Sequence, residues 1–338
     1  MSTDAIQAWL DQHQAQLIDE TRRMLQVPSL KAAPVASGAA KPAPFGQPVR
    51  DALDLALQLG HEAGMRTKDI EGYAGYAEFG SGDRLVVILG HLDVVPVGKG
   101  WNHAPFGAEI DGEYIYSRGA VDDKGPTMAA FHAARAVQAC VPDLPARVRI
   151  VFGCDEESGM ECVQRYLKTE EVPTFGFAPD AGWPVIHGEK GIVNYTVRVE
   201  VPASPFRLLE LTGGQAANIV IDACRARVQV DASVRAEVEK AIADGWDRNV
   251  TATWAGDELQ LEAIGKAAHG SEPWYGDSAA TRLLRRLFEI APLPAKKLHK
   301  ELLKLAHVSG VGLGIHGRDE ASGDLTCNLG LCSTQTDG

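Results

Sequence analysis

The hydrophobic positions in the first part of the chain alternate between helical and strand-like patterns. Apolar residues recur at helical spacing over residues 4–26, near 49–64, after Asp122 and over 160–168. Apolar runs typical of buried strands occupy residues 85–89, 148–154 and 174–178, and shorter strands are expected between 66 and 79. Strands that alternate with helices are typical of a parallel layer. The sequence therefore predicts an α/β fold with a mixed, largely parallel sheet.

The pattern changes after residue 190. Strands are expected over residues 193–199, 208–211, within 215–224 and twice within 251–264, and helices over 234–245 and 278–290. The last stretch, residues 324–338, predicts one strand and a turn. This part is α+β, because strands and helices follow one another without the regular alternation seen before. We expect a first domain over residues 1–190 and a second, a lid over residues 191–338, that is inserted after the first or packed above it.

The composition narrows the class of protein. Of the 338 residues, 45% are hydrophobic and 23% are charged, which is ordinary for a soluble protein with a real core. The 33 basic and 45 acidic residues give a net charge of −12, which argues against nucleic acid or an anionic membrane as partner. The acidic N-terminus does not resemble a secretory signal. The six cysteines form no C-x-x-C pair. We therefore expect a cytoplasmic protein with reduced thiols.

Acidic residues and one histidine follow the predicted strands. His91 and Asp93 come directly after the apolar run that starts at Leu85, and side chains two residues apart in an extended segment point to the same face. Three more acidic clusters follow, namely Asp122-Asp123, Asp155-Glu156-Glu157 and Asp180. Each follows a strand or begins a helix. In parallel sheets, ligands bind beyond the carboxyl ends of the strands, which is where we expect these side chains to meet.

So many carboxylates in one place repel each other unless cations lie between them. Imidazole and carboxylates suit zinc, or a similar divalent ion such as cobalt or manganese. Of the adjacent acids Glu156 and Glu157, one can bind the metal while the other takes a proton from bound water. The alternative for any single cluster is that the acid only caps a helix or a turn. Four clusters at successive strand ends favour a metal site.

These motifs resemble a known enzyme family. G-H-L-D-V-V-P-V-G from Gly90, G-A-V-D-D-K-G-P from Gly119, D-E-E-S-G from Asp155 and F-A-P-D-A from Phe177 occur in this order. Together they resemble the co-catalytic di-zinc metallopeptidases, a group that includes aminoacylases, succinyl-diaminopimelate desuccinylase and carnosinase-like dipeptidases. Within this group the chain resembles the PepV-type dipeptidases, because H-G-E-K-G at 187–191 and P-F-G at 44–46 also fit that branch.

The resemblance implies a set of metal ligands. His91 and Asp180 resemble ligands of one zinc, and Glu157 resembles a ligand of the second zinc. Asp122 resembles the carboxylate that bridges both metals, with its peptide bond to Asp123 in the cis form that the family favours. Two zinc ions are therefore the expected cofactors, bound at the carboxyl ends of the strands.

The resemblance also implies the residues that act in catalysis. Glu156 resembles the general base and Asp93 the partner that supports His91. In the second domain, G-K-A-A-H-G-S places His269 in a motif of the family's lid, and Asn218 resembles a lid asparagine. Both are expected to stabilise the negative charge that develops on the substrate oxygen.

One family feature is missing from the sequence. The second zinc of relatives is completed by a histidine in a Gly-rich segment near the C-terminus, whereas the last histidine here is His316, in a different context. We therefore expect a C-terminally truncated member, whose second zinc lacks that ligand.

The function expected is a zinc-dependent dipeptidase that hydrolyses short unblocked peptides through a metal-bound water, with Glu156 as general base. The alternatives are an N-acyl amino acid deacylase or a carboxypeptidase of the same family, or a non-catalytic metal-binding remnant. The expected partner is a small peptide substrate. The PepV-type branch implies a monomer, although a dimer stays open.

Overall fold

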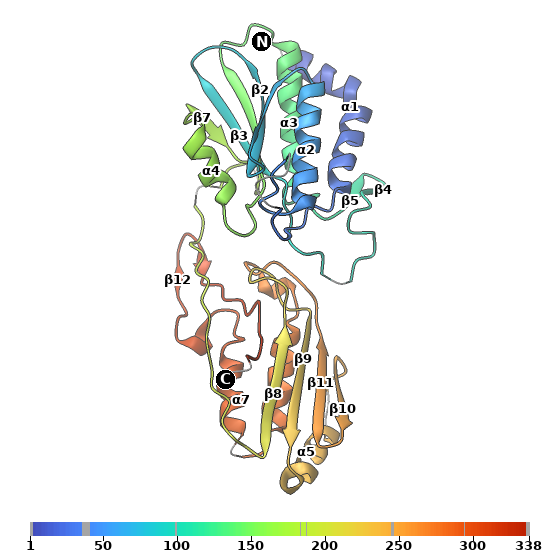
Figure 1. Cartoon of the computed structure of the whole chain (residues 1–338), viewed down its shortest axis with the longest axis vertical. Coiled ribbons are helices and arrows are strands. Elements are labelled where there is room, and N and C mark those ends of the chain that lie inside the picture. Colours follow the sequence, from blue (N-terminus) through green and yellow to red (C-terminus); the bar gives the residue numbers. More distant parts are fainter. Residues whose placement is uncertain are drawn as a thin grey trace. The chain divides into compact units, whose positions relative to one another are not determined.

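The computed structural model describes residues 3–35, 41–98, 100–182, 184–186, 188–244, 247–293 and 295–335. It divides into two compact units (Figure 1). Unit 1 comprises Met1–Val97 and Trp101–Ile186, and unit 2 comprises Gly98–Gly100 and His187–Gly338. His187, the first residue of the H-G-E-K-G motif, lies outside the described residues.

The centre of unit 1 is a five-stranded sheet. Its order is β1 (Arg66–Ile70), β2 (Ala74–Gly80), β6 (Arg147–Gly153), β3 (Leu85–His91) and β7 (Phe175–Phe177). The strands β6, β3 and β7 are parallel to one another, while β1 and β2 join by antiparallel pairing. The prediction of a mixed α/β fold is thus confirmed. The parallel part of the sheet is the part that carries the acidic loops.

Helices cover both faces of this sheet (Figure 1). On one face lie α1 (Thr3–Gln26), α2 (Gln47–Glu62) and α3 (Lys124–Cys140), with α1 packed on α3. On the other face, α4 (Glu161–Thr169) buries Cys162 and Tyr166 against the sheet. Met128 and Phe131 of α3 lie in the main core, as their helical spacing predicts. A short hairpin, β4 (Glu109–Asp111) and β5 (Tyr114–Tyr116), precedes α3.

Unit 2 is built on a four-stranded antiparallel sheet. Its order is β10 (Val250–Ala255), β11 (Glu258–Ile264), β9 (Ala223–Val230) and β8 (Phe206–Gly213). Alternate residues of β9 and β11 are buried, because α6 (Ala279–Ile290) covers one face. The other helices are α5 (Ala232–Ala243) and α7 (Lys296–Lys304). Short elements complete the unit: η1 (Pro273–Tyr275), η2 (Val311–Leu313), β12 (Arg318–Asp319) and β13 (Gly323–Asp324).

Two sequence predictions in unit 2 are wrong. Residues 193–199 form no strand in the described structure, and Val193 and Tyr195 are 80% and 53% exposed. Their alternating pattern shows that the segment can form a strand, but a strand also needs a neighbour whose backbone is free to pair. The expected C-terminal strand is likewise reduced to one isolated pairing, between Cys332 and Gly213.

Within the described ranges, no helix has the length and apolar character needed to cross a bilayer.

Candidate metal centre

His91 is the centre of the candidate site in unit 1. It is the last residue of β3, so the strand continues beyond the apolar run 85–89 that the sequence predicts. The ring is buried, and its Nε2 atom lies 3.1 Å from Oδ1 of Asp122 and 3.4 Å from Oδ2 of Asp180. Oε2 of Glu156 lies 3.9 Å from the same nitrogen. Three carboxylates from three different loops therefore converge on one imidazole nitrogen.

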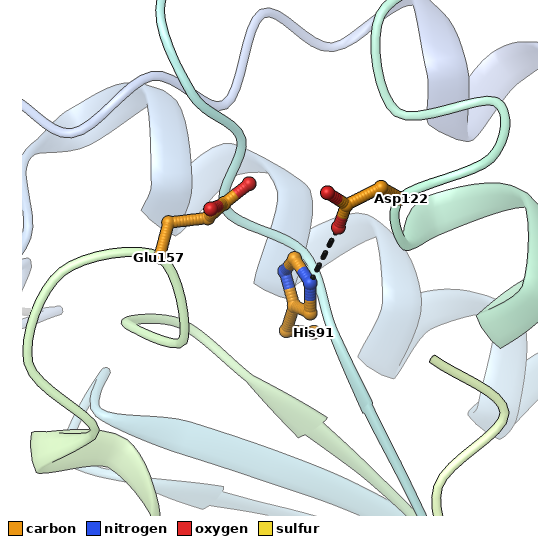
Figure 2. A group of neighbouring side chains, drawn as sticks. All are labelled: His91, Asp122 and Glu157. Carbon is orange, nitrogen blue, oxygen red and sulfur yellow. Dashed lines mark hydrogen bonds and ion pairs between the residues drawn. The ribbon is translucent and has the colours of Figure 1, made fainter. Parts of the chain in front are cut away.

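The topology of the sheet explains this convergence. His91 of β3 pairs with Gly153 of β6, so both parallel strands end at the same level. The loop after β6 carries Glu156 and Glu157, and the loop after β7 carries Asp180. Asp122 comes from the turn that precedes α3. Figure 2 shows His91, Asp122 and Glu157 directed toward a common space.

Two groups of side chains can each hold a metal ion. His91, Asp122 and Glu157 form one group, and His91, Asp123 and Asp180 form the other. Within each group the possible ligand atoms lie within 4.8 Å of one another. The structure thus brings together all four of the ligands that the sequence predicted. The peptide bond between Asp122 and Asp123 is cis, as the resemblance implied.

Asp123 belongs to this centre, although the sequence analysis gave it no role as a ligand. The side chain is fully buried. Its Oδ2 accepts hydrogen bonds from the backbone N–H of His91 (3.1 Å) and the hydroxyl of Thr127 (2.7 Å). Its Oδ1 is buried without a hydrogen-bond partner among the described residues. Burial raises the pKa of Asp123 to about 6. The adjacent acids Asp122 and Asp123 could have indicated this role in the sequence, but only the fold shows that both carboxylates lie at the same histidine.

Asp93 contacts both sides of the centre. The Nδ1–H of His91 donates to the backbone carbonyl of Asp93 at 2.9 Å, while the Asp93 carboxylate is farther away, at 3.6 Å. This hydrogen bond leaves Nε2 as the nitrogen that faces the acids. The carboxylate of Asp93 instead accepts the backbone N–H groups of Glu156 and Glu157, each at 3.1 Å. Asp93 therefore fixes the loop that carries these two glutamates.

The same loop is held from its other side by Asp155. This carboxylate is fully buried, and it accepts hydrogen bonds from Lys31 Nζ at 2.7 Å and from the backbone N–H of Glu161 at 3.2 Å. The hydroxyl of Ser158 donates to it at 2.5 Å. Asp155 thus turns toward Lys31 and serves to shape the loop, whereas the next two glutamates face the centre.

The charge balance of the centre fits a divalent cation. Burial alone lowers the pKa of His91, but hydrogen bonds to Asp122, Asp180 and Asp93 raise it far above its ordinary value. Burial, followed by the charge of Asp122, raises the pKa of Glu157 to about 8. Both shifts favour added positive charge at the centre. Metal ions supply the same positive charge, and imidazole with carboxylates is a suitable donor set. The residues present therefore fit the metal.

Asn218 and His269 lie side by side in unit 2. The backbone N–H of Gly270 donates to the carbonyl of Asn218 at 2.6 Å, and Ile219 and His269 form an isolated β-bridge. The His269 ring is exposed, and its Nδ1 forms a hydrogen bond with the Ser271 hydroxyl at 2.6 Å. The two predicted lid residues thus share one loop junction. Their role at the substrate stays a prediction.

The chain is similar to known peptidases. Residues 87–293 match the model of peptidase family M20/M25/M40. The putative dipeptidase YtjP of Bacillus subtilis is 37% identical over 326 residues, which cover 93% of this chain and 69% of the relative. The putative dipeptidase SH1171 of Staphylococcus haemolyticus is 34% identical over 337 residues, or 96% of this chain and 71% of the relative. Among solved structures, human carnosine dipeptidase 1 is 19% identical, with a TM-score of 0.47, over 64% of this chain and 47% of that chain.

Proposed function

The chain belongs to peptidase family M20/M25/M40, and from this premise we propose that it is a zinc-dependent dipeptidase that hydrolyses short unblocked peptides. The observation that supports the proposal most is the convergence of Asp122 and Asp180 on Nε2 of His91, with Glu157 directed into the same space. This donor set suits a hydrolytic metal centre better than a structural one, because carboxylates and a single imidazole leave positions open.

In the proposed enzyme His91, Asp122 and Asp180 would hold one zinc, and Asp122 and Glu157 would hold the second. Zinc at such a site would lower the pKa of water and polarise the peptide carbonyl. The protein's own contribution is to fix the ligands. Asp93 does so through its hydrogen bonds to the backbone of Glu156 and Glu157, and through its carbonyl contact with His91.

Glu156 is the proposed general base. Its Oε2 atom lies farther from His91 Nε2 than the oxygens of Asp122 and Asp180, and its side chain is 37% exposed, so it is accessible to substrate and water. Burial raises the pKa of Glu156, a change that the nearby acids reinforce and His91 opposes. A raised pKa brings a carboxylate closer to the operating pH, which suits a group that accepts a proton from water and passes it to the leaving amine.

Asn218 and His269 are proposed to donate hydrogen bonds to the oxygen that gains negative charge when the peptide carbonyl is attacked. Neutral donors aimed at such an oxygen lower the barrier by a few kcal/mol in other hydrolases. Two observations support their pairing: the adjacent backbone of both residues, and the exposed position of the His269 ring. We further propose that the enzyme acts as a monomer in the cytoplasm, in keeping with the free state of its six cysteines.

A substrate panel tests the function. Zinc-loaded protein is incubated with an unblocked dipeptide, with an N-acetylated amino acid and with an N-blocked dipeptide, and the amine released is measured. The proposal predicts cleavage of the unblocked dipeptide alone. Glu156→Gln should lose about 10²-fold or more in kcat while it keeps its zinc, whereas the control Glu161→Gln, at an exposed position of α4, should stay within twofold.

Other outcomes would replace the proposal by one of its alternatives. Cleavage of the N-acetylated amino acid would indicate a deacylase, and cleavage of the N-blocked dipeptide would indicate a carboxypeptidase. A protein that binds zinc but cleaves none of the three would be a metal-binding remnant of the family.

A further inference from the structure

Lys124, the first residue of α3, is a buried cation to which the proposed mechanism gives no task. The residue is 0% exposed, and none of the described carboxylates forms an ion pair with it. Its Nζ donates three hydrogen bonds, to the carbonyl oxygens of Val27 at 2.7 Å, Met24 at 3.2 Å and Leu25 at 3.4 Å. All three acceptors are neutral backbone groups from the end of α1 and the residue that follows it.

Burial of Lys124 in these surroundings is energetically unfavourable. Removal of an ammonium group from water is unfavourable, and no carboxylate among the described residues pairs with this one. The compensation comes from α1, because the last carbonyls of a helix have no partners within the helix and lie at its negative end. Capping of α1 does not by itself explain why Lys124 is buried, because a solvent-exposed lysine or a glycine would cap a helix with less loss of solvation.

The stem of Lys124 lies within the turn that carries the metal ligands. A Cβ atom on Gly119, where φ is +81°, would lie 2.7 Å from Cε of Lys124, so the turn closes tightly around the stem. The backbone N–H of Gly125 donates to the carbonyl of Gly119 at 2.9 Å and joins the two ends of the turn. Asp122 and Asp123 lie between these ends.

The contacts of Lys124 thus link two parts of unit 1. One part is the end of α1, which is anchored by Met24 and Leu25 in the core. The other is the turn over residues 119–125, from which Asp122 reaches His91 Nε2 and Asp123 accepts the backbone N–H of His91. We propose that Lys124 is a positioning residue for the metal centre, whose ammonium group ties this turn to the end of α1 and so holds Asp122 and Asp123 against His91. The inference rests on the proposed metal site.

Zinc affinity and stability, measured separately, test this inference. Lys124→Met removes the three hydrogen bonds and keeps most of the volume, and Lys124→Arg keeps the charge. The affinity of each variant for zinc is measured by competition with a chromophoric chelator, and the zinc-free protein is unfolded in urea. Loss of a group that orients ligands weakens metal affinity about 10- to 100-fold, and we expect this loss for Lys124→Met and a smaller one for Lys124→Arg.

The matched control is Arg149→Lys. Arg149 is another buried cation of unit 1, on β6, where it donates to Glu78 and Tyr166. Its replacement should lower stability and leave zinc affinity within twofold of the wild type. If Lys124→Met does not yield folded protein, Gly119→Ala takes its place. That variant keeps the charge but pushes a methyl group against the lysine stem, and it should weaken zinc binding by a similar factor.

The outcomes separate the inference from the function on which it rests. If the wild type binds zinc and Lys124→Met binds it equally well, Lys124 only caps α1 and the inference is overturned. If Arg149→Lys loses as much zinc affinity as Lys124→Met, general loosening explains both and the inference is overturned as well. A wild-type protein that binds no zinc would overturn the proposed metal site, and the positioning role with it.

Discussion

Zinc binding should release protons, and Glu157 should supply one of them. In the metal-free centre, burial and the charge of Asp122 raise the pKa of Glu157 to about 8, and hydrogen bonds to neighbouring acids raise the pKa of His91 far above neutrality. Both groups therefore hold a proton at pH 7. A metal binds the deprotonated carboxylate and the neutral imidazole, so both protons must leave. The perturbation that separates them is Glu157→Gln, which has a similar shape but no proton to lose.

The size of the effect follows from these pKa values. With a pKa of about 8, Glu157 is about 90% protonated at pH 7 and about 10% protonated at pH 9. His91 is present in both proteins, so its contribution cancels in the comparison. The wild type should therefore release about 0.9 proton more than Glu157→Gln at pH 7, and only about 0.1 more at pH 9. Apparent zinc affinity should rise with pH over this interval, because each proton released adds up to tenfold per pH unit.

Isothermal titration calorimetry gives the number of protons released. Zinc is titrated into the protein in buffers with different enthalpies of ionisation, and the slope of the observed heat against buffer enthalpy is the proton count. Glu62→Gln, at the exposed end of α2, is the control and should release as many protons as the wild type. Equal release by the wild type and Glu157→Gln at pH 7 would refute the reasoning, because Glu157 would then not hold a proton that zinc displaces.

Three further predictions concern stability. Asp93→Asn leaves one of the two 3.1 Å backbone hydrogen bonds without an acceptor. It should lower the free energy of unfolding of the zinc-free protein, measured in urea, by about 2 kcal/mol. An unchanged urea midpoint of unfolding would contradict this prediction. Burial lowers the pKa of His299 to about 4, whereas an unfolded histidine titrates near 6.5. The free energy of unfolding of unit 2 should therefore fall by up to about 3 kcal/mol as the pH falls from 6.5 to 4. His299→Phe should remove this pH dependence, which is measured by urea unfolding at several pH values. The Ser278 side chain accepts a hydrogen bond from the backbone N–H of Thr281 at 3.2 Å and so caps α6. Ser278→Ala should lower the free energy of unfolding by about 1 kcal/mol, whereas Ser278→Asp should leave it unchanged. Thermal unfolding measures both effects.

The sequence predicts that these side chains come together, because they follow strand ends. The apolar run that begins at Leu85 and the run that begins at Val148 predict neighbouring strands, and the acids come directly after both. Parallel strands end at one edge of a sheet, so a linear pattern is enough to bring these side chains together. The structure confirms this convergence, with Asp122 and Asp180 at 3.1 and 3.4 Å from His91 Nε2.

Other features depend on contacts that the linear pattern does not contain. Asp123 and Lys124 occur in the same motif as Asp122, yet their burial follows from the packing of α1 and β3 around the turn. Residues 193–199 alternate as a strand would, but whether a strand forms depends on a partner elsewhere in the fold. The helix α7 was not anticipated, although Leu298, Leu302 and Leu303 recur in it at helical spacing.

The number of zinc ions bound per chain tests the central claim most directly. Purified protein is incubated with excess zinc, the loosely held fraction is removed, and the metal is counted for the wild type and for His91→Ala. We expect at least one tightly bound zinc per wild-type chain and its loss in His91→Ala, because Asp122, Asp180 and Glu157 all face this imidazole. A folded wild-type chain without zinc, or a His91→Ala variant that keeps all of it, would contradict the account.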